Sequence, residues 1–203
     1  YGIRGIPNVK LFVDGEPVEE FTGALPRHQI EQWLEENLPS ESKEKLARAE
    51  ALIEEGEDEQ ARSLLEELIS VDSENHEAHI LLARSVVLED PERAVNLLNS
   101  HITDGESEQV AENVQTLAEL LHLAETPADL PDEEGKERFL EALEALSEER
   151  FDETVEAFIE VIQTNRYYRD DASRKACVAL FDLLGPKHEV TRAYRRKFDM
   201  ALY

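Results

Sequence analysis

The chain has 203 residues, which is enough to bury a hydrophobic core in one or two domains. Hydrophobic residues make up 41% and charged residues 33%, a mixture that favours a folded helical protein with a well-solvated surface over disorder. The formal net charge of −26 repels nucleic-acid phosphates and anionic lipid, and no apolar run is long enough to span a bilayer. We therefore expect neither nucleic acid nor a membrane as a partner.

The charge is uneven along the chain. The last 38 residues, from Arg166 to Tyr203, hold nine Lys and Arg against five Asp and Glu, a net of +4, so the remainder carries −30. This tail has two interpretations: solvated helix surfaces, or a basic surface for a partner. The single cysteine, Cys177, excludes an internal disulfide or a dithiol centre, and no basic-then-apolar leader opens the chain. We expect a cytoplasmic protein.

The first 39 residues predict a β-hairpin followed by a helix. Strands are expected over Asn8–Val13 and Glu16–Thr22, because Val9, Leu11 and Val13 alternate and Asp14-Gly15 is a hairpin turn signal. A helix is expected from Pro26 to Asn37, since proline suits a first helical turn. Such a unit buries little area by itself, so we expect it either to be the end of a larger α/β domain that begins before Tyr1 or to pack on something else.

After Ser40 the hydrophobic spacing becomes helical. Gly56 is expected to stop the first helix and Asp58 to cap the second. The first set of helices is predicted from four apolar stripes: Leu46, Ala49, Leu52 and Ile53; Ala61, Leu64, Leu65, Leu68 and Ile69; Ala78, Leu81 and Leu82; Ala94, Leu97, Leu98 and Ile102. The second stripe recurs 33 residues later in the fourth, close to the roughly 34-residue period of tetratricopeptide repeats.

A further helix is predicted over about 106–124, before a proline-containing loop at 126–131. Two prolines in five residues make this loop the expected subdomain boundary. A second set of helices is predicted over about 133–149, 151–165, 170–184 and 187–202. The predicted fold class is mainly α, with tetratricopeptide-like helical repeats after a β-hairpin and helix. The expected division is 1–39, 40–125 and 132–203.

The last predicted helix carries the best candidate for a functional surface. Val190, Tyr194, Phe198 and Leu202 form one continuous apolar stripe, and basic residues surround it. The stripe either caps the last repeat, as terminal helices of solenoids do, or meets a partner. Both hold if the stripe packs inward while the basic side and Tyr203 stay exposed.

Tyr1–Pro7, the following strand, Asp14-Gly15 and Gly23-Ala24-Leu25 together resemble the last third of a thioredoxin domain, over about residues 1–39. The resemblance implies a cis proline at Pro7 and a client-binding role for Ile6 and Pro7. Asn8 departs from the family pattern, which has threonine there. The Cys-x-x-Cys of that family would lie upstream and is absent from this sequence.

The segment Val71–His79 resembles the inter-repeat turn and helix start of tetratricopeptide repeats. A thioredoxin end joined to such repeats resembles the YbbN-type chaperedoxin family of thioredoxin-fold co-chaperones. That resemblance implies a chaperone role in which unfolded clients are held and handed to the chaperonin GroEL or to DnaK. The closing segment resembles the family's C-terminal helix, which implies a chaperonin contact through Tyr194, Arg195, Arg196, Lys197, Phe198, Leu202 and Tyr203.

No motif predicts catalysis, a cofactor or a metal. His76 and His79 stand at i, i+3, whereas the zinc motif HExxH needs i, i+4. Cys177 lies in an apolar helical stretch and is expected to be buried and inert, although Arg174 and Lys175 nearby leave a redox role open. We expect no cofactor and no enzymatic activity from this chain.

Three functional hypotheses remain at this point. The first is a co-chaperone or holdase scaffold that docks on a chaperonin through its C-terminal helix. The second is a thiol–disulfide oxidoreductase of the thioredoxin family whose catalytic half is absent from this sequence. The third is a generic repeat scaffold for one peptide partner.

Overall fold

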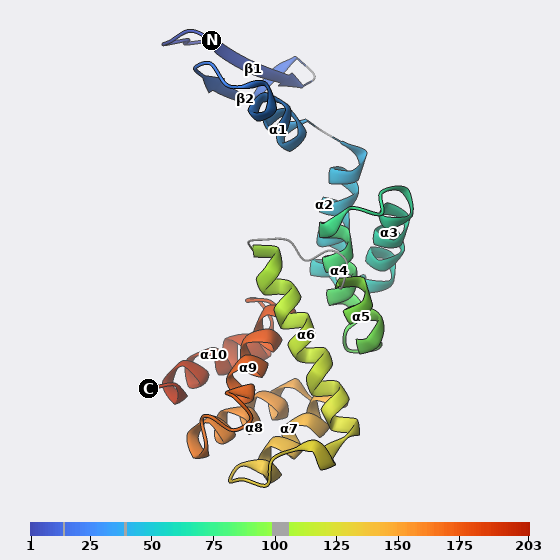
Figure 1. Ribbon diagram of the computed structural model, residues 1–203, viewed down its shortest axis with the longest axis vertical. Coiled ribbons are helices and arrows are strands. Elements are labelled where there is room, and N and C mark those ends of the chain that lie inside the picture. Colours follow the sequence, from blue (N-terminus) through green and yellow to red (C-terminus); the bar gives the residue numbers. More distant parts are fainter. Residues whose placement is uncertain (14, 39, 99–105) are drawn as a thin grey trace. The chain divides into compact units, whose positions relative to one another are not determined.

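The computed structural model describes residues 1–13, 15–38, 40–98 and 106–203. They form two compact units, Tyr1–Arg48 and Ala49–Tyr203, and the mainly helical fold class is confirmed (Figure 1). Three predicted features fall outside the described residues: Asp14 of the turn, Pro39 at the expected domain boundary, and Ile102 of the fourth apolar stripe.

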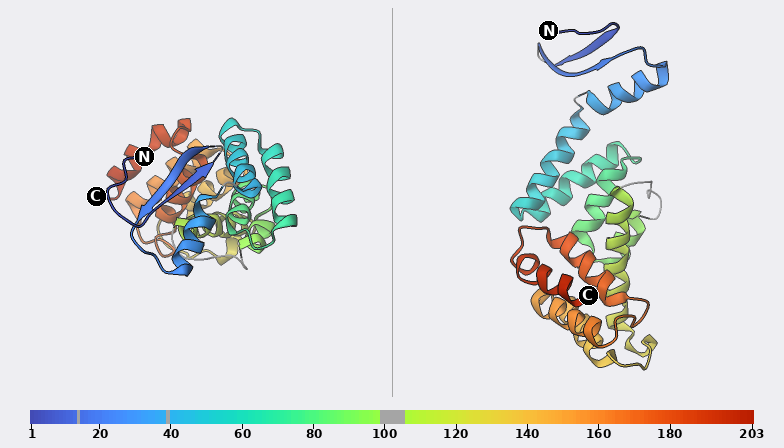
Figure 2. Two further views of the ribbon diagram at one scale, coloured as in Figure 1. Left: turned by 90° about the horizontal axis from the view of Figure 1, so that it is seen from above. Right: turned by 90° about the vertical axis from the view of Figure 1, so that its left-hand side faces the viewer.

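The first unit contains the predicted hairpin. Strands β1 (Asn8–Val13) and β2 (Glu16–Thr22) pair antiparallel with the predicted bounds, from Asn8 opposite Thr22 to Val13 opposite Glu16 (Figure 2). Lys10 and Glu20 stand opposite each other and form an ion pair across the strands.

Helix α1 (Arg27–Asn37) follows the hairpin and packs on it through aromatic rings. The rings of Phe21 and Trp33 meet edge-on with centroids 4.9 Å apart, a favoured geometry for aromatic pairs. Pro26, the expected first residue of this helix, lies instead at the N-cap, one residue before α1, with extended backbone. Helix α2 (Glu41–Glu55) begins in this unit and ends in the second.

The second unit contains the helical repeats. Its remaining elements are α3 (Asp58–Val71), α4 (His76–Val86), α5 (Pro91–Leu98), α6 (Glu106–Glu125), the 3-10 helix η1 (Pro127–Asp129), α7 (Lys136–Ser147), α8 (Phe151–Thr164), α9 (Ala172–Leu184) and α10 (Glu189–Ala201). Each predicted helix is present, with ends that differ from the expected ones by three residues or fewer.

Of the two predicted helix ends, the glycine is confirmed and the aspartate is not, and an asparagine caps a further helix. Gly56 ends α2 with a φ of 79°, and the Asn75 side chain accepts a hydrogen bond from the Ala78 N–H at 3.0 Å to cap α4. The expectation that Asp58 caps α3 is wrong. The Glu57 N–H still donates to the Leu52 carbonyl at 2.8 Å, so the turn is short and Asp58 already lies inside the first turn of α3.

Helix α6 lies at the centre of the second unit. It packs against α4 and α5 on one side and against α7 and α9 on the other (Figure 1). Its buried residues therefore face several directions: Ala111, Val114, Leu117, Ala118, Leu120 and Leu123. The loop at 126–131, where a subdomain boundary was expected, lies inside this single unit, because both sets of helices share α6 as part of their core.

The second set of helices is built around aromatic side chains. The Phe139 ring lies 5.4 Å from that of Phe158 and 5.1 Å from that of Tyr168, between centroids, and all three are fully buried. The Tyr168 hydroxyl donates to the Pro131 carbonyl at 2.9 Å, which fixes the loop before α7. In the described part of the chain, no helix combines the length and the apolar character that crossing a membrane requires.

Candidate functional site

Helix α10 is anchored to the second unit by its apolar side. Its N-terminus is capped by His188, whose Nδ1 accepts a hydrogen bond from the Val190 N–H at 3.3 Å. Phe198 is only 2% exposed, and its ring meets that of Phe181 on α9 edge-on at 5.6 Å between centroids. Val190 and Thr191 are buried as well. The helix is therefore a packed part of the fold.

The opposite side of α10 carries a ridge of exposed side chains, which we call the basic ridge: Arg192, Arg196, Met200 and Tyr203. These residues follow one another at intervals of four, four and three, so they lie on one side of the helix. Met200 is 70% exposed and Tyr203 fully exposed. Within the described residues, neither Arg192 nor Arg196 forms an ion pair.

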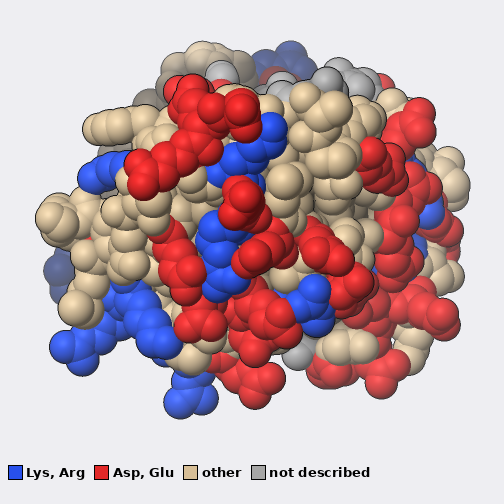
Figure 3. Space-filling view, turned by 90° about the horizontal axis from the view of Figure 1, so that it is seen from below, with Lys and Arg blue, Asp and Glu red and all other residues tan. Residues whose placement is uncertain are grey.

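Other cations near α10 are held by contacts within the unit. The Arg195 guanidinium lies 5.4 Å from the Phe181 ring centroid and 3.8 Å from the Asp199 carboxylate. Lys197 Nζ lies 4.5 Å from the Tyr194 ring centroid. On the face shown in Figure 3, several Lys and Arg lie together at the lower left, and others stand among the Asp and Glu that crowd the middle and the right.

The structure thus divides the residues predicted for partner binding. Arg195, Arg196, Lys197 and Tyr203 are exposed, Tyr194 and Leu202 are half-buried, and Phe198 is buried. Phe198 packs against Phe181 on α9 and is not accessible to a partner while the fold is intact. Arg192 and Met200, which the sequence reasoning left out of the predicted site, lie on the exposed side instead. Their i, i+4, i+8 spacing with Arg196 was the signal that would have found them.

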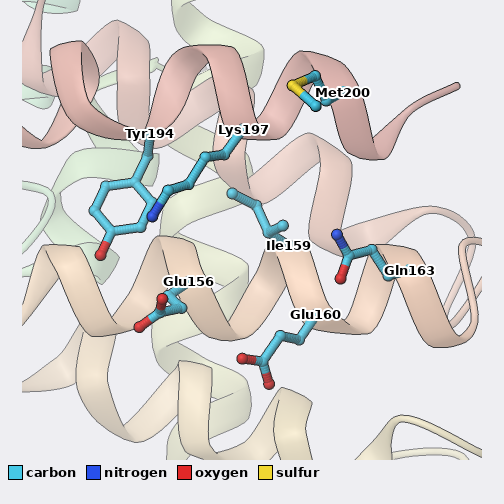
Figure 4. Close-up of a pocket in the computed structure, with 7 residues that line it drawn as sticks. All are labelled: Glu156, Ile159, Glu160, Gln163, Tyr194, Lys197 and Met200. Atoms are coloured by element: carbon cyan, nitrogen blue, oxygen red, sulfur yellow. The ribbon is translucent and has the colours of Figure 1, made fainter.

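A groove of about 340 Å³ runs between α8 and α10 (Figure 4). Glu156, Ile159, Glu160 and Gln163 come from α8, and Tyr194, Lys197 and Met200 from α10. The pKa of the Tyr194 hydroxyl is raised above its ordinary value, chiefly by burial and further by the negative charges of Glu156 and Asp152. The raised pKa extends to higher pH the range over which the phenol is protonated beside these carboxylates.

A second groove of about 440 Å³ lies at the N-terminal ends of the same two helices and shares Tyr194 with the first. Three carboxylates line it, those of Glu149, Asp152 and Glu189, together with the rings of Phe151, His188 and Tyr194. The Phe151 and His188 rings meet edge-on at 6.4 Å between centroids. Because the first residues of α8 face the first residues of α10, the two helices run in the same direction.

The N-terminal candidates lie in the other unit. The Ile6–Pro7 peptide bond is cis, as the thioredoxin resemblance implied, and the Ile6 side chain is 91% exposed. The Pro7 carbonyl accepts a hydrogen bond from the Gly23 N–H at 2.8 Å and so is already engaged.

His79 and Cys177, two residues weighed as site residues in the sequence, are both buried. His79 is buried, and its Nε2 lies 3.2 Å from the Ser73 carbonyl oxygen. Among the residues that the structure describes, no group of three His, Cys, Asp or Glu side chains is placed to hold a metal ion. Cys177 is fully buried, and this burial raises the pKa of its thiol well above the ordinary value. Arg174 and Lys175, the cations near it in sequence, pair with Asp171 and Asp170.

Comparison with known proteins identifies the repeats. Two family models described as tetratricopeptide repeat match residues 42–85 and 122–203. A thioredoxin from Rhodospirillum rubrum is 40% identical over 38 residues, which are 19% of this chain and 36% of that thioredoxin. The matched segment thus spans only about a third of the thioredoxin's length.

Proposed function

Because the chain is a tetratricopeptide-repeat protein with similarity to thioredoxin, we propose that it is a non-enzymatic co-chaperone of the holdase type. In this proposal the protein binds exposed segments of unfolded clients and docks through α10 on a chaperonin of the GroEL kind, with DnaK as a further partner. A protein-interaction scaffold is the general function that tetratricopeptide repeats indicate. The chaperone role, the named partners and the cytoplasmic location rest on the resemblance to chaperedoxins.

The observation that carries the docking proposal is the basic ridge. Two arginines without ion pairs within the described residues stand beside an exposed methionine and a fully exposed tyrosine. Aromatic residues, methionine and arginine are the types enriched in protein interfaces. The rest of the chain carries −30, so a cationic element in the C-terminal segment gives an acidic partner surface a favoured orientation and a faster encounter.

The same negative charge suits the holding of clients. A strongly charged body repels its own copies and keeps a complex with an apolar client in solution. Docking through a ridge that is already exposed needs no rearrangement of α10, because Phe198 remains packed on Phe181 throughout.

Similarity to thioredoxin favours one second candidate, thiol–disulfide exchange. Exchange needs an accessible thiolate, and the buried Cys177 does not offer one. The reacting thiols would have to come from residues outside this sequence. We expect no reduction of insulin disulfides by this chain in the presence of dithiothreitol, and measurable turnover would support the oxidoreductase instead.

Binding to purified GroEL tests the docking proposal. We compare the intact chain with a variant that carries Arg192→Gln and Arg196→Gln, using biolayer interferometry at low and at physiological salt. We expect the dissociation constant to rise about tenfold, since each exposed charge contact is worth roughly 0.2–1 kcal/mol and about 1.4 kcal/mol is a factor of ten.

A matched control separates the ridge from net charge. Arg4→Gln together with Lys175→Gln removes the same charge from exposed positions outside α10 and should leave binding unchanged. If the intact chain does not bind at low salt, or if both variants weaken binding equally, docking through α10 is excluded. Suppression of aggregation for several unrelated clients would then decide between a general holdase and a scaffold for one peptide.

A further inference from the structure

The groove at the N-terminal ends of α8 and α10 differs in charge from its surroundings. Among the described residues, its carboxylates (Glu149, Asp152 and Glu189) form no ion pair, and no lysine or arginine lines it. Three negative charges therefore face one concave space without a balancing cation.

In the neighbouring hollow between α7 and α8, by contrast, arginines pair with carboxylates. There, Arg138 pairs with Glu141 and with Glu160 at 2.7 Å, and Arg150 pairs with Glu148 at 2.7 Å and with Glu153. Two of the four carboxylates that line that hollow, those of Glu141 and Glu153, are thus paired with arginines of the chain itself. Those of the α8–α10 groove leave a negative potential for something else to neutralise.

The walls of the groove are aromatic. The rings of Phe151 and His188, which meet edge-on, both line it, and Tyr194 lines both this groove and the adjoining one. Aromatic faces attract cations and also cover the methylene stems of lysine and arginine. A groove lined by both aromatic rings and carboxylates matches a long cationic side chain better than an anion or a purely apolar group.

We infer that this groove binds a lysine or arginine side chain of an extended partner segment, with an adjacent apolar residue of that segment in the groove between Ile159 and Met200. Two grooves that share Tyr194 accommodate neighbouring side chains of one peptide. This groove assignment names the kind of client segment that the protein holds. It rests on one part of the proposed function, namely that the chain binds other proteins.

A second copy of the chain is a poorer occupant than a foreign segment. Each copy carries a net charge of −26, so two copies repel each other before any local contact forms. A basic, partly apolar segment of an unfolded protein is instead attracted by the same field. Arg192, Arg196 and Tyr203 of the basic ridge line neither groove, whereas Met200 also lines the first groove. The ridge therefore adjoins the first groove and is separate from the acidic one.

The test uses fluorescence anisotropy with a labelled peptide in which lysine and leucine alternate between glycine spacers. A peptide with glutamate in place of lysine is the ligand control. The groove variant carries Glu149→Gln and Asp152→Asn, which keep the shape of both side chains. The matched protein control carries Glu92→Gln and Glu119→Gln, which remove the same charge from exposed positions, one of them in a first helical turn as Asp152 is. Thermal unfolding by circular dichroism checks that both variants fold.

We expect the lysine peptide to bind, the glutamate peptide not to bind, and the groove variant to weaken binding about three- to tenfold while the control variant matches the original chain. Equal weakening by both variants would mean unspecific attraction to a negative surface and would overturn the inference. So would sedimentation showing a dimer that the groove variant dissociates, since the occupant would then be a second copy.

The same variants separate this inference from the proposed function. GroEL binding is expected to persist in the groove variant and to fall in the Arg192→Gln, Arg196→Gln variant. Loss of peptide binding alone leaves the docking proposal standing, and loss of GroEL binding alone leaves the groove assignment standing.

Discussion

Cys177 shows how burial alone removes a reactive group. The thiol is fully enclosed in α9 among apolar neighbours, and the desolvation of a thiolate there raises its pKa. Its packing role is that of a small hydrophobic residue. The cations that flank it in sequence point to aspartates instead.

We predict that Cys177 does not react with a thiol-specific maleimide in the native protein at neutral pH, because labelling requires a solvent-exposed thiolate. In urea, above the unfolding transition, labelling should be complete within minutes. Mass spectrometry of samples quenched over time gives both rates. Rapid labelling under native conditions would show that α9 opens locally and would reopen a redox role.

The pKa of the Glu89 carboxylate is shifted by a single partner, Arg62. Both of its oxygens accept from Arg62, at 2.6 and 2.8 Å, which is the two-pronged geometry that arginine forms best. The hydrogen bonds from Arg62 are the main cause that lowers the pKa of Glu89 below the ordinary value of a glutamate. A lowered pKa in the fold means that this pair stabilises the protein above the unfolded-state pKa, and that the stabilisation is lost as the pH falls through the folded value.

The variant Glu89→Gln should therefore destabilise the protein by about 0.2–1 kcal/mol at neutral pH, a small effect because the carboxylate is 62% exposed. The difference from the original chain should shrink once the pH is well below 4.5. Urea unfolding at both pH values measures it. Glu119→Gln, at an exposed position on α6, is the control, and a difference that grows on acidification would contradict the assignment.

Between elements, Arg84 joins the two sets of helices. It leaves α4 and donates from Nη2 to the carbonyl oxygens of Asp182 and Leu183, at 2.5 and 3.2 Å, in the last turn of α9. These carbonyls belong to the group that a helix leaves without internal partners, and a cation there also complements the helix dipole. One side chain thus satisfies the end of a helix that lies nearly a hundred residues further along the chain.

We predict that Arg84→Met lowers the free energy of unfolding by about 1.5–3 kcal/mol, the usual range for hydrogen bonds to a charged group. Methionine keeps most of the aliphatic stem, so the loss reports on the guanidinium. Arg84→Lys should recover part of the stability, since the charge remains but the fork geometry does not. Denaturant unfolding monitored by circular dichroism supplies the values. Equal stability of the two variants would assign the effect to packing instead.

For the molecule as a whole, charge opposes folding. With a net charge of −26, the folded chain brings negative charges closer together than the unfolded chain does, and their repulsion destabilises the fold. The ion pairs over α7 and α8 oppose this, but exposed pairs contribute only about 0–1 kcal/mol each, and 47 acidic residues face 21 basic ones.

Because the repulsion between like charges outweighs the attraction within the ion pairs, we expect added salt, which screens both, to stabilise the fold. Between roughly 0.01 and 0.15 M salt, the screening length falls from about 30 to about 8 Å. We predict that the midpoint of thermal unfolding rises over this range, measured by circular dichroism in sodium chloride. A fall in the midpoint would mean that the ion-pair networks dominate. Binding of the lysine peptide should weaken over the same range, because the attraction it depends on is screened.

The sequence by itself determined the order and nature of the elements. Helical periodicity, the turn at Asp72–Asn75 and glycine at Gly56 depend on interactions over a few residues, and both strands have the predicted bounds. The spacing of Val190, Tyr194 and Phe198 likewise predicted which side of α10 is apolar. The error at Asp58 arose because a hydrogen bond across the turn, and not residue preference, decided where α3 begins.

Only the tertiary structure decided what those elements build together. The sharing of α6 between both sets of helices, the burial of Phe198 under Phe181 and the grooves beside Tyr194 all depend on contacts between residues far apart in the sequence. Periodicity gives the side of a helix that is apolar, but it does not give the neighbour that covers it or the gap left between two helices. Those are properties of packing, which is decided by the shape and volume of all the side chains at once.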